Sequence, residues 1–224
     1  ATATSIQEDA QIIDGQWVKE GATIRPTWLD YDRLVGIGDL SWTDYEVVVP
    51  VTIHAVDVDD GFKSPSNGPG IGLLLRWQGH FQQLDEQPRT GWQKLGALGW
   101  FRWDRDADRN IIAGLQLLGY YSGRELAVDP TTVPAFETPY FFKMSVQTAT
   151  VGDIYRFKVW EQSKPEPAKW NMVAQGDGNG PDTGSAVLVA HHIDASFGNV
   201  RVQPLSAIRP RLTVNVNGNG HVLV

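Results

Sequence analysis

The sequence predicts an all-β protein, folded as a two-sheet antiparallel β-sandwich. Short runs rich in β-branched and aromatic residues recur along the chain, and clusters of glycine, proline, aspartate and asparagine separate them. No segment keeps the hydrophobic period of a helix over ten or more residues. The length of 224 residues suits one sandwich domain.

Seven segments carry the strand signal. They are Tyr45–His54, Gly70–Gln78, Ile111–Tyr121, Tyr140–Thr148, Ile154–Glu161, Ala186–His192 and Val200–Gln203. Polar turn clusters lie between them, for example at 59–70 and 104–110. Pro50 suits an edge position or a bulge, because proline cannot donate a hydrogen bond to a neighbouring strand.

Alternation of side chains predicts which face of each strand is buried. In the segment 154–161, Tyr155, Phe157 and Val159 point to one side, and two charged residues and a tryptophan point to the other. The segment 142–147 repeats this pattern, as expected for strands with one core face and one polar face. The runs 71–77 and 186–192 are almost continuously apolar, which predicts strands near the middle of two packed sheets.

Composition excludes some partners. The net charge is −7, from 26 acidic and 19 basic residues, so a nucleic acid is a poor partner. The absence of cysteine does not decide the compartment. No apolar run approaches the roughly 18 residues of a membrane span.

Three phrases suggest a family. An early strand follows Trp-x-Asp-Tyr-Glu at 42–46, a mid-chain strand ends in Arg76, and a late strand reads Phe-x-Asn-Val-Arg-Val at 197–202. Together they resemble the concanavalin A-like lectin and glucanase superfamily, particularly its laminin G-like bacterial jelly rolls, over about residues 12–204. This resemblance implies a jelly-roll fold, and its members include carbohydrate-binding modules, glycoside hydrolases, polysaccharide lyases and protein-binding modules.

The resemblance also implies a ligand on the concave sheet or over its rim loops. Alternation along the segment 70–80 puts Arg76, Gln78 and His80 on a polar face and leaves Trp77 in the core. The stretch 77–103 is rich in tryptophan, arginine and glutamine, a mixture that suits sugar rings and their hydroxyl groups.

On the next strand, Trp100 and Arg102 alternate with Phe101 and Trp103. We expect the first pair to face the ligand, because the second pair is more apolar. The candidate ligand-binding residues are Arg76, Gln78, His80, Arg89, Trp92, Trp100, Arg102 and Tyr121.

The sequence leaves open whether the protein is an enzyme, but its residue pattern favours binding without catalysis. Retaining glycosidases of this fold carry Glu-x-Asp-x-x-Glu, which sets two carboxyl groups ~5–5.5 Å apart, and this spacing is absent from the sequence. A lyase would need a set such as Arg76, Gln78, His80 and Tyr120 or Tyr121 to neutralise a uronate and move its proton. The phrases typical of lyases are absent as well.

Calcium is the cofactor that the sequence suggests, as a structural ion. In the loop 177–184, Asp177, Asn179 and Asp182 alternate with small residues that let backbone carbonyl groups turn inward. The resemblance implies an aspartate just before the last strand, where this chain has Gly198. Asp194, four residues earlier, is the candidate replacement.

The chain end predicts the domain organisation. Residues 212–224 alternate like a strand with a Gly-Asn-Gly turn, and they resemble the opening strand of repeat modules in bacterial secreted proteins. We therefore expect a jelly-roll domain at 1–205, a linker at 206–211 and, at 212–224, a C-terminal strand or the truncated start of a following repeat module.

The leading hypothesis is a non-catalytic module that binds a polysaccharide or oligosaccharide, as a monomeric part of a larger secreted, extracellular bacterial protein. The alternatives are a polysaccharide lyase or glycoside hydrolase on the same fold, and a laminin G-like adhesion or protein-binding module. No membrane or nucleic-acid partner is expected.

Overall fold

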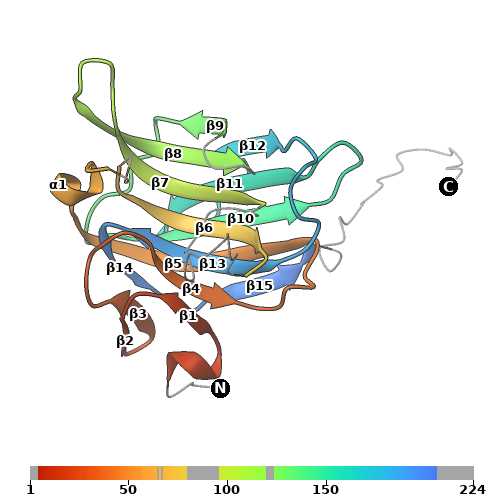
Figure 1. The fold of residues 1–224 in the computed structure, drawn as a ribbon, viewed down its shortest axis with the longest axis horizontal. Coiled ribbons are helices and arrows are strands. Elements are labelled where there is room, and N and C mark those ends of the chain that lie inside the picture. The colour runs from red at the N-terminus through yellow and green to blue at the C-terminus, as the bar shows by residue number, and fades with distance from the viewer. Residues whose placement is uncertain (1–4, 65, 67, 80–95, 120–123, 206–224) are drawn as a thin grey trace, which may run out of the picture.

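The computed structural model describes residues 5–64, 66, 68–79, 96–119 and 124–205. In this part of the chain, two antiparallel sheets pack face to face, so the predicted β-sandwich is confirmed (Figure 1). The helical elements are short: η1 (Ile6–Glu8) and α1 (Val58–Gly61). Within the described ranges, no helix combines the length and the hydrophobicity that crossing a membrane requires.

Each sheet brings together strands from distant parts of the chain. Sheet A has the order β1 (Gln11–Asp14), β4 (Arg33–Ile37), β13 (Ser185–His191), β6 (Gly70–Trp77), β7 (Ala97–Arg105), β8 (Ile111–Gly119) and β9 (Glu125–Asp129). Sheet B has the order β12 (Met172–Gln175), β11 (Ile154–Glu161), β10 (Pro139–Gln147), β5 (Tyr45–Val56), β14 (Ile193–Phe197), β3 (Thr23–Pro26) and β2 (Trp17–Glu20), and β15 (Arg201–Pro204) also pairs with β5.

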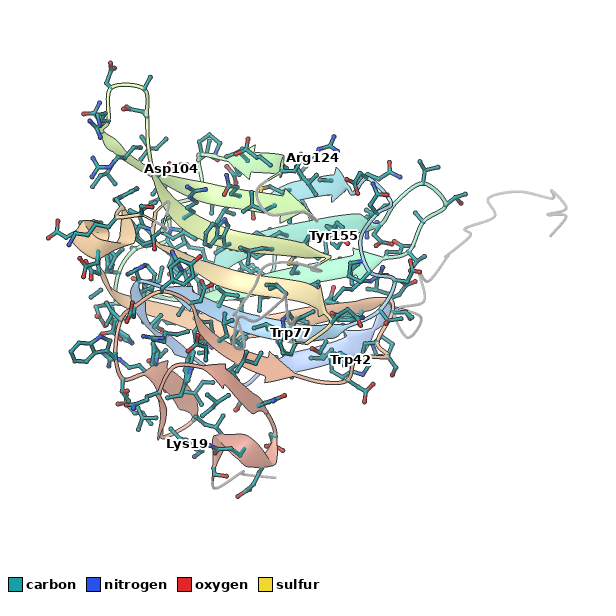
Figure 2. All side chains as sticks on the ribbon, viewed as in Figure 1. Lys19, Trp42, Trp77, Asp104, Arg124 and Tyr155 are labelled. Carbon is teal, nitrogen blue, oxygen red and sulfur yellow. The ribbon has the colours of Figure 1, made fainter. Side chains whose placement is uncertain are left out.

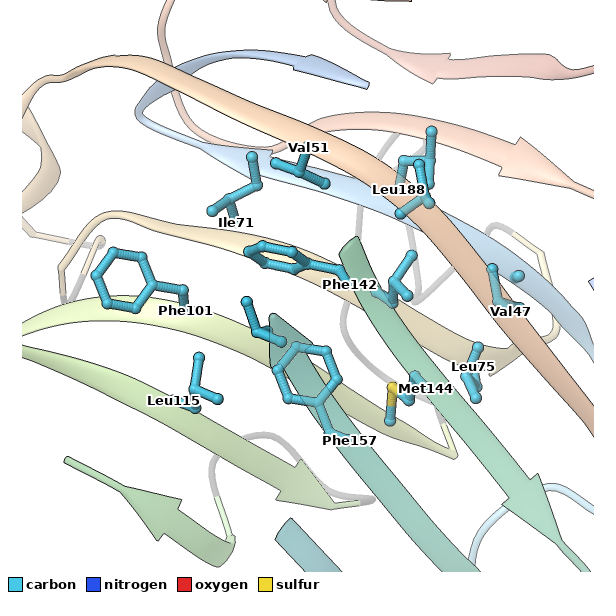
Figure 3. Packing of buried hydrophobic residues seen from close by; sticks show 14 of the residues in the cluster. Val47, Val51, Ile71, Leu75, Phe101, Leu115, Phe142, Met144, Phe157 and Leu188 are labelled. Atoms are coloured by element: carbon cyan, nitrogen blue, oxygen red, sulfur yellow. The ribbon is translucent and has the colours of Figure 1, made fainter. Parts of the chain in front are cut away.

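The inner core fills the space between the two sheets (Figure 3). Every second side chain of β5, β10 and β11 enters it, as the alternation in 142–147 and 154–161 predicted for two of these strands. Each large side chain that is fully buried here contributes about 1.5–3 kcal/mol to folding. The inner core includes Val47, Val51, Ile71, Leu75, Phe101, Leu115, Phe142, Met144, Phe157 and Leu188.

A second apolar group covers the opposite, outward face of sheet A, and we call it the outer cluster. β6 and β13 therefore bury side chains on both faces, which explains their continuous apolar sequences and their central positions. The outer cluster consists of Leu34, Leu74, Trp77, Leu98, Trp100, Leu118, Val187 and Val189.

Pro50 lies in a central strand, so the prediction of an edge position or a bulge is wrong. On one side β5 pairs with β10, where Pro50 stands opposite Phe141. On the other side β14 pairs with β5 from Val51 onward, and β15 pairs only as far as Val48. The missing N–H of proline thus lies at the junction between two partner strands, where no ladder bond is lost.

The end of the described chain belongs to the sandwich. β15 pairs with the first residues of β5, and the backbone N–H of Leu205 donates to the carbonyl oxygen of Asp44 at 3.0 Å. The expected linker at 206–211 and the segment 212–224 lie outside the described residues.

Candidate functional site

β7 presents Trp100 and Arg102 on the outward face of sheet A. Phe101 and Trp103 enter the inner core, with exposed fractions of 0% and 8%. The predicted orientation of the two pairs on this strand is therefore correct. It follows from the two-residue period of a strand whose more apolar side must face the other sheet.

Gln116 on β8 connects these side chains into a network. Its Oε1 atom accepts hydrogen bonds from Trp100 Nε1 at 3.0 Å and from Arg102 Nη1 at 3.1 Å. Its Nε2 atom donates to Glu125 on β9 at 2.7 Å. Arg102 also pairs with Asp104 at 3.3 Å, and its guanidinium lies 5.6 Å from the centre of the Trp100 ring. Three strands thus fix one set of polar groups.

Trp100 orients this network and offers no stacking face. Its exposed fraction is 3%, and its ring lies against Gly70 of β6, where a Cβ atom would collide with it; a Cβ atom at Gly72 would collide with the backbone oxygen of Gly99 and with the Cβ atom of Trp100. Glycine at both positions therefore permits the close approach. The predicted stacking of a sugar on this indole is prevented by its burial. Its Nε1 atom donates to Gln116.

Arg102, Asp104, Gln116 and Glu125 form what we call the polar patch. Gln116 is buried and holds the patch together, and the accessible groups are those of Arg102, Asp104 and Glu125. The side chain of Arg102 is 15% exposed and that of Asp104 46%, and Glu125 is exposed on the edge strand β9. The patch combines a guanidinium, an amide and two carboxylates. These groups can donate to and accept from neighbouring hydroxyl groups, which act as donors and acceptors at once.

Sequence reasoning missed Gln116 and Glu125. Gln116 is the one polar side chain in the apolar run 115–118, and that isolation is a usable signal, because a polar side chain on a buried strand needs a partner. Glu125 carries no such signal, since it is one of many surface carboxylates.

Arg76 does not follow the alternation that placed it on the polar face. It has a φ of +57°, and the pairing register of β6 with β13 shifts there, between Ser185 and Ala186. A residue inserted at such a bulge turns its side chain away from the regular direction. Trp77 is displaced as well, because it lies in the outer cluster and not between the sheets as predicted.

The Arg76 side chain is completely buried and satisfied within the protein. Its Nη1 atom donates to Asp153 at 2.6 Å and to the carbonyl oxygen of Pro181 at 3.0 Å. Its Nη2 atom donates to Thr148 Oγ1 at 2.8 Å, and Thr43 accepts from both Nε and Nη2. The predicted ligand-binding role of Arg76 is corrected to a structural one, since no surface of this guanidinium reaches solvent.

Two buried tyrosines complete this set of contacts around Arg76, which we call the Arg76 hub. The hydroxyl of Tyr45 accepts the backbone N–H of Arg76 at 2.9 Å, and that of Tyr155 donates to Asp153 at 3.2 Å. Burial raises the pKa of both phenols, so they stay neutral. Burial also raises the pKa of Asp153, although the neighbouring guanidinium opposes this shift.

The rest of the predicted row is not assembled around Arg76. Gln78 turns toward Thr183, where its Nε2 atom donates to the backbone oxygen and to Oγ1. His80, Arg89, Trp92 and Tyr121 lie outside the described residues.

The predicted calcium ligands do not come together into a metal site. Asp194 binds Arg25 through both carboxylate oxygens, each at 2.6 Å, so its charge is already balanced. Asp177 accepts the backbone N–H of Asn179 and lies 3.7 Å from Arg124. Asp182 is exposed. No group of three or more histidine, cysteine, aspartate or glutamate side chains that could hold a metal ion occurs among the residues that the structure describes.

A groove of about 440 Å³ lies at the other end of the same sheet, and we call it the N-terminal groove. The segment around η1 and β1 forms one wall with Gln7, Asp9 and Gln11, and Leu40 and Trp77 contribute apolar surface. β6 and β7 are antiparallel, so Trp77 at the end of β6 and Asp104 near the end of β7 lie at opposite ends of sheet A (Figure 2).

Comparisons with known proteins identify the fold. No protein family model matches the chain, and no curated protein matches it. Among solved structures, the carbohydrate-binding module CBM66 from Bacillus subtilis is 14% identical with a TM-score of 0.53, over 87% of this chain and 95% of that one. The exoplasmic/lumenal domain of VIP36, bound to Ca²⁺ and Man3GlcNAc, is 14% identical with a TM-score of 0.55, over 94% and 88%.

Both structures are concanavalin A-like jelly rolls, so the fold that the sequence resemblance implied is confirmed. At this level of identity the likeness concerns the fold, and function has to be argued from the site.

Proposed function

We propose that this chain is a non-catalytic carbohydrate-binding module and that it holds a saccharide at the polar patch. The observation that carries the proposal is the network in which Gln116, fixed by Trp100, positions Arg102 and Glu125 on one sheet face. Support comes from fold neighbours of which one is a carbohydrate-binding module and the other was solved with a mannose-containing ligand.

The chemistry of the patch suits hydroxyl groups. Arg102 donates in a planar fork, and Asp104 and Glu125 accept. Because the network holds these groups in place before binding, less rotamer freedom is lost when a sugar arrives. A few such bonds, exposed to water, give micromolar to millimolar binding, about −4 to −8 kcal/mol.

The proposal includes a biological setting. The ligand is a polysaccharide or oligosaccharide, and the module acts as a monomeric part of a secreted, extracellular bacterial protein. The sequence of residues 212–224, which resembles the start of a repeat module, supports this setting. The domain content of the full-length gene tests it, and a catalytic domain beside the module would also indicate the polysaccharide.

Replacing Arg102 tests the site. We expect Arg102→Ala to weaken binding on a polysaccharide affinity gel or glycan array by roughly tenfold to a hundredfold, about 1.4–2.8 kcal/mol, because a charged donor is lost. Glu125→Gln should weaken binding without disturbing the fold, since Glu125 is exposed. Arg201→Ala is the matched control, because Arg201 is exposed on sheet B over Phe141.

Unchanged binding by both site variants, with unchanged thermal midpoints, would place the ligand elsewhere. Retention of the wild type by no neutral or acidic polysaccharide would contradict the proposal itself. Running each gel with calcium and with a chelator tests the calcium prediction. On uronate polymers, growth of the ultraviolet absorbance of an unsaturated uronate would reveal a lyase instead.

A further inference from the structure

We propose that the N-terminal groove is a second saccharide-binding site, selective for uncharged sugars. The inference rests on the proposed function for its ligand chemistry, but it concerns different residues at the opposite end of sheet A. Its volume of about 440 Å³ lies within the range of ligand pockets in proteins.

Three of the polar side chains that line the groove have no hydrogen-bonding partner among the described residues. Gln7, Asp9 and Gln11 are exposed. Within the described part of the chain, their side chains make no hydrogen bond. Two amides supply donors and acceptors, and the carboxylate accepts, so together they can bind the alternating donors and acceptors of a sugar's hydroxyl groups.

Apolar side chains line the groove as well. Leu40 is 46% exposed, and Trp77 lines the groove from the end of β6. A sugar ring has an apolar C–H face as well as polar edges, so a groove lined by side chains of both kinds matches it. A purely aliphatic ligand would leave the amides and the carboxylate desolvated and unpaired.

Charge decides the class of saccharide. Asp9 is the charged residue among the described residues that line the groove, and no lysine or arginine is among them. A uronate, sulfate or phosphate group would meet a carboxylate of the same sign, with no compensating cation among the described lining residues. The net charge of −7 adds to this repulsion. The groove therefore fits a neutral hexose or neutral oligosaccharide.

The rim of the groove is held in shape by packing. Gly38 has a φ of +93°, and the ring of Trp42 occupies the space that a Cβ atom would need there. Trp42 in turn packs edge-on against Tyr45, with ring centres 5.4 Å apart. The backbone that carries Leu40 is thus tied to the inner core, and a ligand does not have to order it.

The test uses the full chain labelled with ¹⁵N and titrated with neutral tetrasaccharides (maltotetraose, cellotetraose and mannotetraose) and with tetragalacturonate as the acidic counterpart. We expect a neutral tetrasaccharide to shift the side-chain amide signals of Gln7 and Gln11. The double variant Gln7→Ala/Gln11→Ala should weaken that binding by at least about tenfold, or 1.4 kcal/mol. Gln162→Ala, at an exposed turn after β11, is the matched control.

The outcomes separate the two proposals. NMR signal shifts that are confined to the polar patch, and that the double variant does not change, would overturn the groove site and leave the proposed function intact. Tetragalacturonate that binds the groove more tightly than every neutral sugar would overturn the assigned class. No shift anywhere with any saccharide would overturn both. An unchanged thermal midpoint of the double variant, expected for exposed side chains, shows that a loss of binding is not a loss of fold.

Discussion

At the scale of single residues, the segment 42–46, which carries the family resemblance, contacts the buried Arg76. The phrase at 42–46 contributes the backbone oxygen of Thr43, the carboxylate of Asp44 and the hydroxyl of Tyr45 to Arg76. Arg76, the next-to-last residue of β6, is therefore the partner of this early phrase. Both serve the Arg76 hub, which joins β6 to the turn before β11 through Asp153.

Replacement of Arg76 should lower the stability of the protein strongly. We expect Arg76→Met to lower the free energy of unfolding by about 3–5 kcal/mol, because the carboxylate of Asp153 stays buried without its cation. Denaturant unfolding measures this loss. Arg124→Met is the control, since its ion pair is 3.7 Å long and its side chain is 66% exposed, so a change of less than about 0.5 kcal/mol is expected. A loss below about 1 kcal/mol for Arg76→Met would contradict the hub.

At the scale of elements, the edge strands of the two sheets are tied together by polar side chains. Asp129, the last residue of β9 in sheet A, accepts hydrogen bonds from Thr131, Thr132 and Asn171. Asn171 also accepts the backbone N–H of Val159 on β11 of sheet B at 2.9 Å. One asparagine beside β12 thus connects both sheets at the edge where β9 and β12 lie close together (Figure 1).

This tie predicts an acid-sensitive contribution to stability. Burial acts to raise the pKa of Asp129, but the hydrogen bonds from these three residues outweigh it and lower the pKa from 3.8 to about 2. A lowered folded-state pKa stabilises the protein above the unfolded value, and the contribution is lost as the pH falls through the folded value. We expect Asp129→Asn to cost about 1 kcal/mol near neutral pH, after allowance for solvent screening.

Unfolding free energies of the wild type and Asp129→Asn, compared near neutral pH and near pH 2, measure this contribution. The gap between the two proteins should narrow toward the lower pH. Asp108→Asn, an exposed carboxylate at the β7–β8 turn, is the control and should show no gap at either pH. A gap that stays constant with pH would mean that the hydrogen bonds, and not the charge of Asp129, account for the effect.

At the scale of the whole molecule, sheet A carries two separate polar regions in addition to the apolar outer cluster on its outward face. The polar patch and the N-terminal groove lie toward opposite ends of this sheet, as the antiparallel run of β6 and β7 requires. If both bind the same glycan chain, the second contact is made at high effective concentration, and longer chains bind more tightly than short ones.

The proposed domain boundary can be tested on the same scale. A chain that ends after Leu205 should keep its thermal midpoint and its saccharide binding, because it retains β15 and the hydrogen bond from Leu205 to Asp44. A chain that ends after Val200 loses β15, leaves the first residues of β5 unpaired on one side and should melt several degrees lower. Equal midpoints for the two truncations would show that β15 does not stabilise the sandwich.

Most of the fold was predictable, and the site only in part. The strand over Ile154–Glu161 was predicted with its observed bounds, and the orientation of Trp100 and Arg102 followed from the apolar character of their neighbours. Gln116 and Glu125 escaped prediction, because their significance depends on three strands lying side by side. The three polar residues of the N-terminal groove escaped it as well, since nothing local links them to the end of β6.

The sequence by itself determined the all-β class, the positions of the longer strands and, outside the bulge at Arg76, which of their side chains enter the inner core. These features follow from a two-residue period that each strand carries in its own residues. Only the tertiary structure decided that Arg76 turns inward and that the polar patch and the groove exist. The reason is physical: the partner of Arg76 lies 77 positions away, and a bulge with positive φ reverses the face that alternation assigns. A buried guanidinium then takes the direction in which its charge can be paired.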